Sequence, residues 1–199
     1  MNIFVLDLDP QKCAEYHCDK HICKMIVEHC QILGSIAYTA RGVYRKKDIT
    51  PEFIDKHFQG FPRKESDGRP KPYGIGYKNH PCTQWATSSM QNYLWLCTLT
   101  LKMCEEYTKR YARKHAGEDI CRWYYSNMPA TLPMLQMTPF AQAMPEDCKG
   151  PDAVIAYRNY YVQYKSRFAK WAHSDTPTWF VDGVRRHQIS QEEIRVLAE

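Results

Sequence analysis

The run DPQKCAEYHCDKHICKMIVEHCQILGSIAY, from Asp9 to Tyr38, carries the strongest helix signal in the chain. Asp9 is a good N-cap residue, and Pro10 suits the first helical position because it has no N–H to leave unpaired. Apolar positions then recur every three or four residues as far as Gly34 or Tyr38. This pattern predicts one long helix, whose buried stripe holds Cys18, Ile22, Met25, Ile26, His29 and Leu33.

The rest of the chain is also predicted to be mainly helical. Asn2–Asp7 is short, apolar and partly β-branched, which favours a strand or an extended arm. A segment rich in Gly, Pro and Lys separates the first helix from a second one, which Thr83 caps and Gly117 closes. A last helix is aromatic on one side and basic on the other. The predicted elements are a short helix at Pro51–Phe58, long helices at Gln84–Lys114 and Asp152–His173, a helix at Glu118–Asn127, and an irregular segment at Met128–Pro145.

Length and composition predict a single domain over residues 1–199, a compact helical fold with a basic Gly/Pro-rich loop insertion at about 41–81. The chain has 199 residues, of which 44% are hydrophobic and 25% charged, as in ordinary globular proteins. No apolar run approaches the roughly 20 residues that cross a bilayer, and the first ten residues lack the pattern of a secretory signal. We therefore expect a soluble, cytoplasmic protein. Nine cysteines without a CxxC pair favour reduced thiols over a disulfide framework.

Positive charge is concentrated in three runs that are interleaved with tyrosines. The net charge is +5 at pH 7, and the runs lie at Arg41–Lys47, Pro62–Lys78 and Lys109–Lys114. Each run alone is typical of a solvated surface. Together with 13% aromatic residues, they favour nucleic acid, DNA before RNA, or a nucleotide as the partner.

One face of the first predicted helix gathers acid, base and amine groups. His17, His21, Lys24 and Glu28 follow one another at helical spacing, with Lys20 and Cys13 at the edge of the same face. We expect this face to point away from the apolar stripe. A solvated polar face explains the pattern equally well, but the same groups could combine proton transfer with attack by an amine.

A zinc site competes for these residues. His17 and His21 have the spacing of two zinc ligands, and Cys13, Cys18 or the His80-x-Cys82 pair could complete a set of four. These spacings match no finger, ribbon or HExxH pattern, so we expect no metal and no other cofactor. The chain also contains no GxSxG, P-loop, GxGxxG or kinase signature.

Stiff loops elsewhere carry polar side chains that suit substrate binding. The motif NHPC-x-x-W places Asn79, His80 and Trp85 at the start of the second helix, and TPFAQAMP places Gln142 in the irregular segment. Arg158 stands on the basic side of the last helix. A role confined to shaping turns is an equally good interpretation of both loop motifs.

These motifs carry a resemblance to a known family. The start MNIF, the HCDKH-x-x-KM segment, the NHPC-x-x-W and TPFAQAMP motifs and the terminal PTWF (Pro177–Phe180) are similar to small phage proteins of the pyrimidine-dimer DNA glycosylase/AP lyase family, endonuclease V type. The resemblance implies that the N-terminal α-amine attacks the sugar C1′ of a damaged nucleotide and forms a Schiff base. It also implies a catalytic glutamate on the first helix and, if the chain is phage-encoded, a location in the host cytoplasm.

Two departures from the family pattern affect the residue assignment. Counted from the arm, the family's glutamate falls near Ile22, so Glu28 or Asp19 must substitute, and only Glu28 shares the face of His17 and His21. Asn2 is bulky, so we expect Met1 to be retained and to supply the amine. The expected catalytic residues are Met1, His17, His21, Lys24 and Glu28, and the expected substrate-binding residues are Lys20, Asn79, His80, Trp85, Gln142 and Arg158.

Two other functions fit the same residues. One is a transferase that hypermodifies bases of phage DNA on the same scaffold. The other is a protein that binds nucleic acid or a nucleotide without catalysis, which the many Tyr, Trp, Lys and Arg side chains would support.

Overall fold

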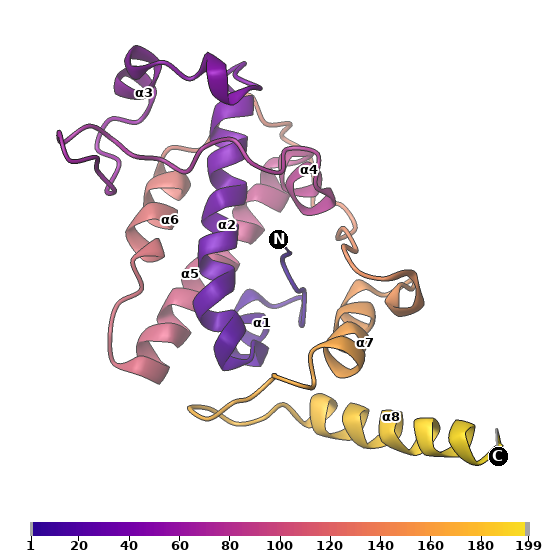
Figure 1. The fold of residues 1–199 in the computed structure, drawn as a ribbon. Coiled ribbons are helices and arrows are strands. Elements are labelled where there is room, and N and C mark those ends of the chain that lie inside the picture. Colours follow the sequence, from indigo (N-terminus) through magenta and orange to yellow (C-terminus); the bar gives the residue numbers. More distant parts are fainter. Residues whose placement is uncertain (1, 198–199) are drawn as a thin grey trace.

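Helix α2 (Asp19–Thr39) runs through the middle of the molecule, and the other helices are arranged around it (Figure 1). The computed structural model describes the backbone of residues 2–197 and the side chains of residues 2–189. Helices α4 (Pro81–Thr87), α5 (Met90–Tyr111) and α6 (Gly117–Ser126) pack against α2. Its C-terminal half is buried from Ile32 to Tyr38. The described chain contains eight α-helices and no strand, so the prediction of a mainly α fold is confirmed.

The single long helix predicted from Asp9 to Tyr38 is wrong, because the chain breaks at His17 and Cys18. Helix α1 (Pro10–Tyr16) begins at the predicted Asp9 cap, whose carboxylate accepts the N–H of Gln11. His17 and Cys18 then have extended backbone angles, and α2 starts at Asp19. The periodicity continues across the break, so the sequence gives no sign of it.

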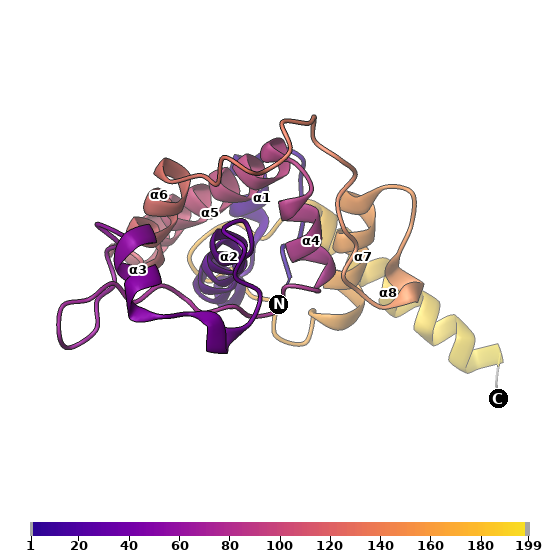
Figure 2. The ribbon, with the colours of Figure 1, turned by 90° about the horizontal axis from the view of Figure 1, so that it is seen from above.

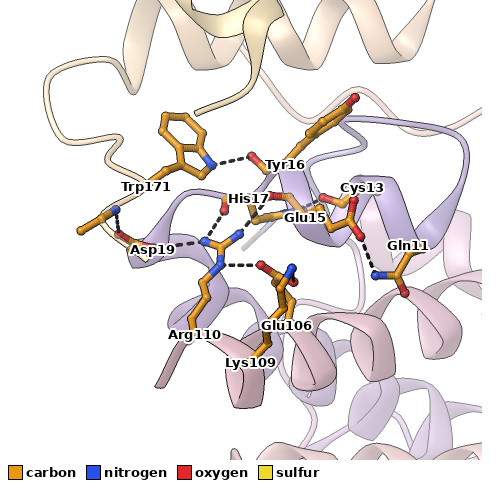
Figure 3. A network of polar contacts seen from close by, with 11 residues as sticks. Gln11, Cys13, Glu15, Tyr16, His17, Asp19, Glu106, Lys109, Arg110 and Trp171 are labelled. Carbon is orange, nitrogen blue, oxygen red and sulfur yellow. Dashed lines mark hydrogen bonds and ion pairs between the residues drawn. The ribbon is translucent and has the colours of Figure 1, made fainter. Parts of the chain in front are cut away.

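Arg110 of α5 stabilises this break (Figure 3). Its guanidinium donates to the carbonyl oxygens of Glu15 and His17, at 2.9 and 2.8 Å. It also pairs with the Asp19 carboxylate at 3.1 Å and with Glu106 at 2.8 Å. The bend leaves carbonyl groups without helical partners, and a side chain 93 residues away in sequence satisfies them.

The second predicted helix is also divided. His80 caps α4, Ser89 caps α5, and Thr83 lies buried inside α4, so Thr83 is not the cap. Helix α5 ends at Tyr111, and Ala112 adopts the left-handed conformation with φ 50°. Gly117 begins α6 instead of closing α5. It packs closely on Ile26 of α2, where a Cβ would be 2.5 Å from a methyl carbon.

The N-terminal residues Asn2–Leu6, which we call the arm, are extended in places but form no strand. All five are buried. Phe4 has a φ of 54°, which prevents regular strand geometry. The Cys13 thiol binds both sides of this turn, because it donates to the Phe4 carbonyl at 3.4 Å and accepts the Leu6 N–H at 3.3 Å. The arm is therefore part of the core.

The segment from Arg41 to Pro81 contains the predicted short helix, α3 (Pro51–His57), and a 3-10 turn, η1 (Lys46–Asp48). Phe58 and Phe61 are completely buried and pack on Trp123 of α6. The segment is thus anchored at its middle, while most of its charged residues face solvent. All nine cysteines of the chain are free thiols, in agreement with the prediction.

The C-terminal part differs most from the prediction. Asp152 caps α7 (Ala153–Tyr164) as expected, but the helix ends at Tyr164 and not at His173. A 3-10 turn, η2 (Glu146–Cys148), precedes it. Helix α8 (Thr178–Leu197), which the sequence did not predict, packs on α7 and projects from the body of the molecule (Figures 1 and 2). Among residues 2–197, none of the helices combines the length and apolarity needed to span a bilayer.

Candidate active site

A cavity of about 300 Å³ opens where the arm, α2 and α7 meet. The arm provides Asn2 and Phe4, α2 provides one face of its N-terminal half, and the region of α7 provides the opposite wall. The start of the described chain lies beside α2 and α4 in both views (Figures 1 and 2). The predicted residues at this cavity are Lys20, His21, Lys24 and Glu28.

The Glu28 carboxylate contacts the first described residue of the chain, Asn2. The backbone N–H of Asn2 donates to Glu28 Oε2 at 3.0 Å. Lys24, one helical turn earlier, contacts Glu28 Oε1 at 3.2 Å. The Glu28 side chain is only 12% exposed, whereas that of Lys24 is 63% exposed. A largely buried carboxylate is thus held next to the N-terminal backbone. It belongs to Glu28, whereas the count along the chain placed the family's glutamate near Ile22.

The side chain of Asn2 fixes the position of the arm. Its Oδ1 accepts the N–H of Ile3 at 2.8 Å, and its Nδ2 donates to the Ala143 carbonyl at 2.7 Å. Ala143 belongs to the TPFAQAMP motif, so the motif acts here through its backbone. The amide side chain of Asn2 is therefore a structural clamp, and a smaller residue would lose both contacts.

His21 forms part of the wall of the cavity and is held in a fixed orientation. Its Nδ1 is hydrogen-bonded to the Tyr161 hydroxyl, and the Phe4 ring lies against the imidazole with centroids 4.5 Å apart. Burial, and then the charges of His17 and the nearby lysines, lower the pKa of His21 to about 2. His21 is neutral at pH 7 and too weak a base to share the proton chemistry of a carboxylate.

His17 does not reach the cavity, and the predicted shared face is wrong for this residue. It lies at the break between α1 and α2, completely buried, with Nδ1 2.7 Å from the Cys13 carbonyl. Burial lowers the pKa of His17 to about 4. Because His21 is buried as well, neither histidine belongs to a solvated polar surface. The two rings remain neighbours, with centroids 6.4 Å apart, although only His21 lines the cavity.

Three lysines surround the cavity, and one of them was not predicted. Lys20 lies over the Phe168 ring at 4.7 Å from its centroid. Lys165 donates to the Tyr160 hydroxyl at 2.9 Å and lies 4.3 Å from the centre of that ring. The aromatic and basic pattern of the last helix contained this signal, but the sequence could not show which helix faces α2.

The remaining predicted binding residues have separate roles. Trp85 is buried against Trp95 and Phe140. The Gln142 amide bridges the backbone N–H and carbonyl of Gly150, at 3.0 and 2.6 Å. The structure therefore gives Trp85 and Gln142 packing and loop-bracing contacts, and neither lines the cavity.

Arg158 and the NHPC motif do not line this cavity, although Arg158 contacts the end of the arm. Arg158 donates to the Leu6 carbonyl at 2.9 Å and pairs with Asp7 at 3.3 Å, so it holds the end of the arm. His80 Nδ1 accepts the N–H of Cys82, and therefore the neutral ring carries its proton on Nε2. Burial lowers the pKa of His80, and the nearby Glu28 carboxylate partly opposes this. Asn79 faces a different cavity, beside Tyr44 and Lys78.

The residues of the alternative zinc site do not converge. Within the described residues, no group of three or more His, Cys, Asp or Glu side chains is placed to hold a metal ion. The cysteines near His17 are instead packed in the core, where burial raises the pKa of Cys13 to about 12. A protonated thiol of this kind is a poor metal ligand.

Comparison with known proteins identifies the class and then the family. The sequence pattern of the DNA glycosylases that act on pyrimidine dimers matches residues 1–119, which is more than half of the chain. The chain belongs to the pyrimidine dimer DNA glycosylase family. Membership implies a DNA glycosylase-like function in DNA repair and binding to DNA. Neither the curated proteins nor the solved structures contain a significant match. The matched residues include the arm and α1–α5, whereas α7 and α8 lie beyond them.

Proposed function

We propose that this protein removes damaged pyrimidines from DNA and then cleaves the strand, using an amine nucleophile and the Glu28 carboxylate. The observation that carries the proposal is the contact between Asn2 N and Glu28 Oε2 at 3.0 Å. Membership of the pyrimidine dimer DNA glycosylase family supports pyrimidine dimers as the substrate. A cavity rimmed by lysines supports this assignment, because the substrate is a polyanion.

In the proposed reaction, the α-amine attacks C1′ of the damaged nucleotide and the glycosidic bond breaks. The base departs with its bonding electrons and takes up a proton. The amine nitrogen loses two protons, one to Glu28 and one to the ring oxygen O4′, as the C1′–O4′ bond breaks and the opened sugar forms an imine. Removal of a C2′ proton then expels the 3′ phosphate from C3′, and water hydrolyses the imine to restore the amine. A free α-amine suits this chemistry because its ordinary pKa is about 7.7–8.0.

The position of the nucleophile follows from chain connectivity. Met1 lies outside the described residues. One residue spans at most about 3.6 Å, so an amine on Met1 is one residue away from the nitrogen that contacts Glu28. If Met1 is removed, the Asn2 nitrogen itself becomes the amine. In the second form the amine is the nitrogen that contacts Glu28, and mass spectrometry of the purified protein distinguishes the two forms.

Access to C1′ requires the damaged nucleotide to leave the base stack. Enzymes that act on a base in duplex DNA extrude a nucleotide into a pocket, at a cost that is lowest for damaged pairs. Phe4, Tyr160 and Phe168 provide aromatic surface around the lysines and Glu28. This combination suits a sugar and a base attached to a charged backbone.

Borohydride trapping on duplexes that contain a pyrimidine dimer or an abasic site tests this function. We expect a covalent protein–DNA adduct, because borohydride reduces the imine to a stable amine. Extension of the chain before Met1 should abolish the adduct, while Lys20→Gln and Lys24→Gln variants should retain it. An adduct that survives the extension and disappears with one lysine would assign the nucleophile to that lysine. Binding without any adduct would favour the non-catalytic function.

A further inference from the structure

A second cavity, of about 400 Å³, lies between α7 and α8. Two arginines and a histidine line it, Arg158, Arg186 and His187, together with the amides of Asn159 and Gln163 and the indole of Trp179. No carboxylate is among its lining residues. The cavity therefore offers several donors and the guanidinium of Arg186, whereas the guanidinium of Arg158 is already paired with Asp7 at its edge.

This cavity is separate from the candidate active site. The two cavities share no lining residue. They use different sides of α7, because Tyr160 and Lys165 line the first, whereas Asn159 and Gln163 line the second. The lining residues all follow residue 119, so they lie beyond the part of the chain that defines the family.

The walls of the cavity are held in a fixed relation. Gly183 of α8 packs so closely on α7 that a Cβ there would come 2.6 Å from Val162 Cγ2. Arg186 is one helical turn later, on the same side of α8. Arg158 lies over the Trp179 ring, 5.2 Å from its centroid, and is tied to the arm through Leu6 and Asp7. The cations thus come from two helices whose distance is set by a glycine contact.

We propose that the α7–α8 cavity is a second nucleotide site, which binds one phosphate-bearing nucleotide unit. Guanidinium groups suit phosphate oxygens because their N–H donors form a planar fork. Asn159 and Gln163 supply donors and acceptors for a base edge, and Val162 and Trp179 supply the apolar wall that ligand cavities of this size usually have. The nucleotide is either a unit of the bound DNA strand or a free nucleotide, and only the first source rests on the proposed function.

Arg186 and Arg185 form a matched pair for the test. Both are exposed and adjacent on α8, but only Arg186 lines the cavity. Binding is measured with an undamaged fluorescent duplex over a range of salt concentrations, and with deoxynucleoside monophosphate by calorimetry. For Arg186→Ala we expect duplex affinity to fall roughly tenfold and the salt slope to fall by about 1, whereas Arg185→Ala behaves like the original protein.

Other outcomes distinguish a DNA strand from a free nucleotide as the ligand, and the second site from the proposed function. Loss of monophosphate binding in Arg186→Ala, with unchanged duplex binding, assigns the site to a free nucleotide. Equal losses of affinity in Arg186→Ala and Arg185→Ala would show that general surface charge causes the effect, and would overturn the proposal. Unchanged binding of both the duplex and the monophosphate in Arg186→Ala would overturn it as well. Borohydride trapping, measured in parallel, reports on the first cavity alone. Retained trapping with unaltered binding in Arg186→Ala would therefore refute the second site and leave the proposed function intact.

A Gly183→Ala variant provides independent evidence. The added Cβ should push α8 away from Val162, so the cavity changes shape without the loss of any charge. We expect the same loss of binding as in Arg186→Ala, with the salt slope preserved. Unchanged binding in this variant would show that the geometry between α7 and α8 is irrelevant.

Discussion

Two carboxylate–cation clusters flank the N-terminal half of α2, and their surroundings differ. At the break between α1 and α2, Arg110 is fully buried and uses all of its nitrogen atoms on Glu106, Asp19 and two backbone carbonyls (Figure 3). Nine residues after Asp19, the carboxylate of Glu28 lies at the wall of a cavity, beside the exposed Lys24. A saturated buried cluster holds a fold together, whereas a carboxylate at a cavity can still exchange a proton.

Replacement of the cavity carboxylate should give the largest effect, and it should fall on activity. We expect Glu28→Gln to lower the rate of base release by about 10²–10⁴-fold, roughly 3–5 kcal/mol of transition-state stabilisation. The amide keeps the shape and can still accept the Asn2 N–H, so folding and DNA binding should persist. Single-turnover kinetics measure this. The control is Glu105→Gln, which alters an exposed carboxylate paired with Lys102 at 2.7 Å and should leave the rate unchanged.

Removal of the buried guanidinium should act on stability instead. We expect Arg110→Ala to lower the free energy of unfolding by about 3–5 kcal/mol, because Glu106 and the carbonyl of His17 would stay buried without a partner. Urea denaturation measures the change. Arg122→Ala, which breaks the exposed pair with Glu118 at 2.9 Å, should cost less than about 1 kcal/mol. Equal costs would contradict the distinction between the two clusters.

Acidification should weaken the buried region. Burial lowers the pKa of His17 to about 4 and that of His29 to about 3, from an ordinary value of 6.5. Between the lowered pKa of each histidine and its ordinary value of 6.5, the unfolded chain binds more protons than the folded one, so the free energy of unfolding rises with pH. The contribution of each neutral buried histidine to stability is therefore lost as the pH falls below about 6.5. We expect a loss of about 1 kcal/mol per buried histidine between pH 7 and pH 5.5.

Urea titrations at several pH values measure this dependence. The matched variant is His29→Gln, which should reduce the slope of stability against pH. His173→Gln, at an exposed position, should leave the slope unchanged. A slope that does not respond to His29→Gln would show that the histidines do not control acid sensitivity.

The smallest effect should follow replacement of the exposed lysine. Lys24→Gln removes a surface ion pair at 3.2 Å, which should change the free energy of unfolding by no more than about 0.5 kcal/mol. If the lysines around the cavity contact DNA phosphates, the same change should reduce the salt slope of DNA binding by about 1. A stability loss as large as that of Arg110→Ala would mean that both clusters are structural.

The sequence by itself determined the local features of this protein. The Asp9 and Asp152 caps begin helices where the sequence places them. The helical spacing of Lys20, Lys24 and Glu28 sets them on one side of α2, and all three line the cavity. Helix caps depend on hydrogen bonds within one turn, and the side of a helix on which a residue lies depends on the 3.6-residue period. Both features can therefore be predicted from residues three or four positions apart in the sequence.

Only the tertiary structure decided where helices break and which surfaces meet. His17 belongs to the periodic pattern of its neighbours, yet it lies at the break where Arg110 binds its carbonyl, and of the two histidines only His21 lines the cavity. Contact between Asn2 and Glu28 joins residues 26 positions apart, and Lys165 completes a cavity from beyond the long irregular segment. Periodicity contains no information about such contacts, because they depend on how separate elements pack and on which buried polar groups need partners.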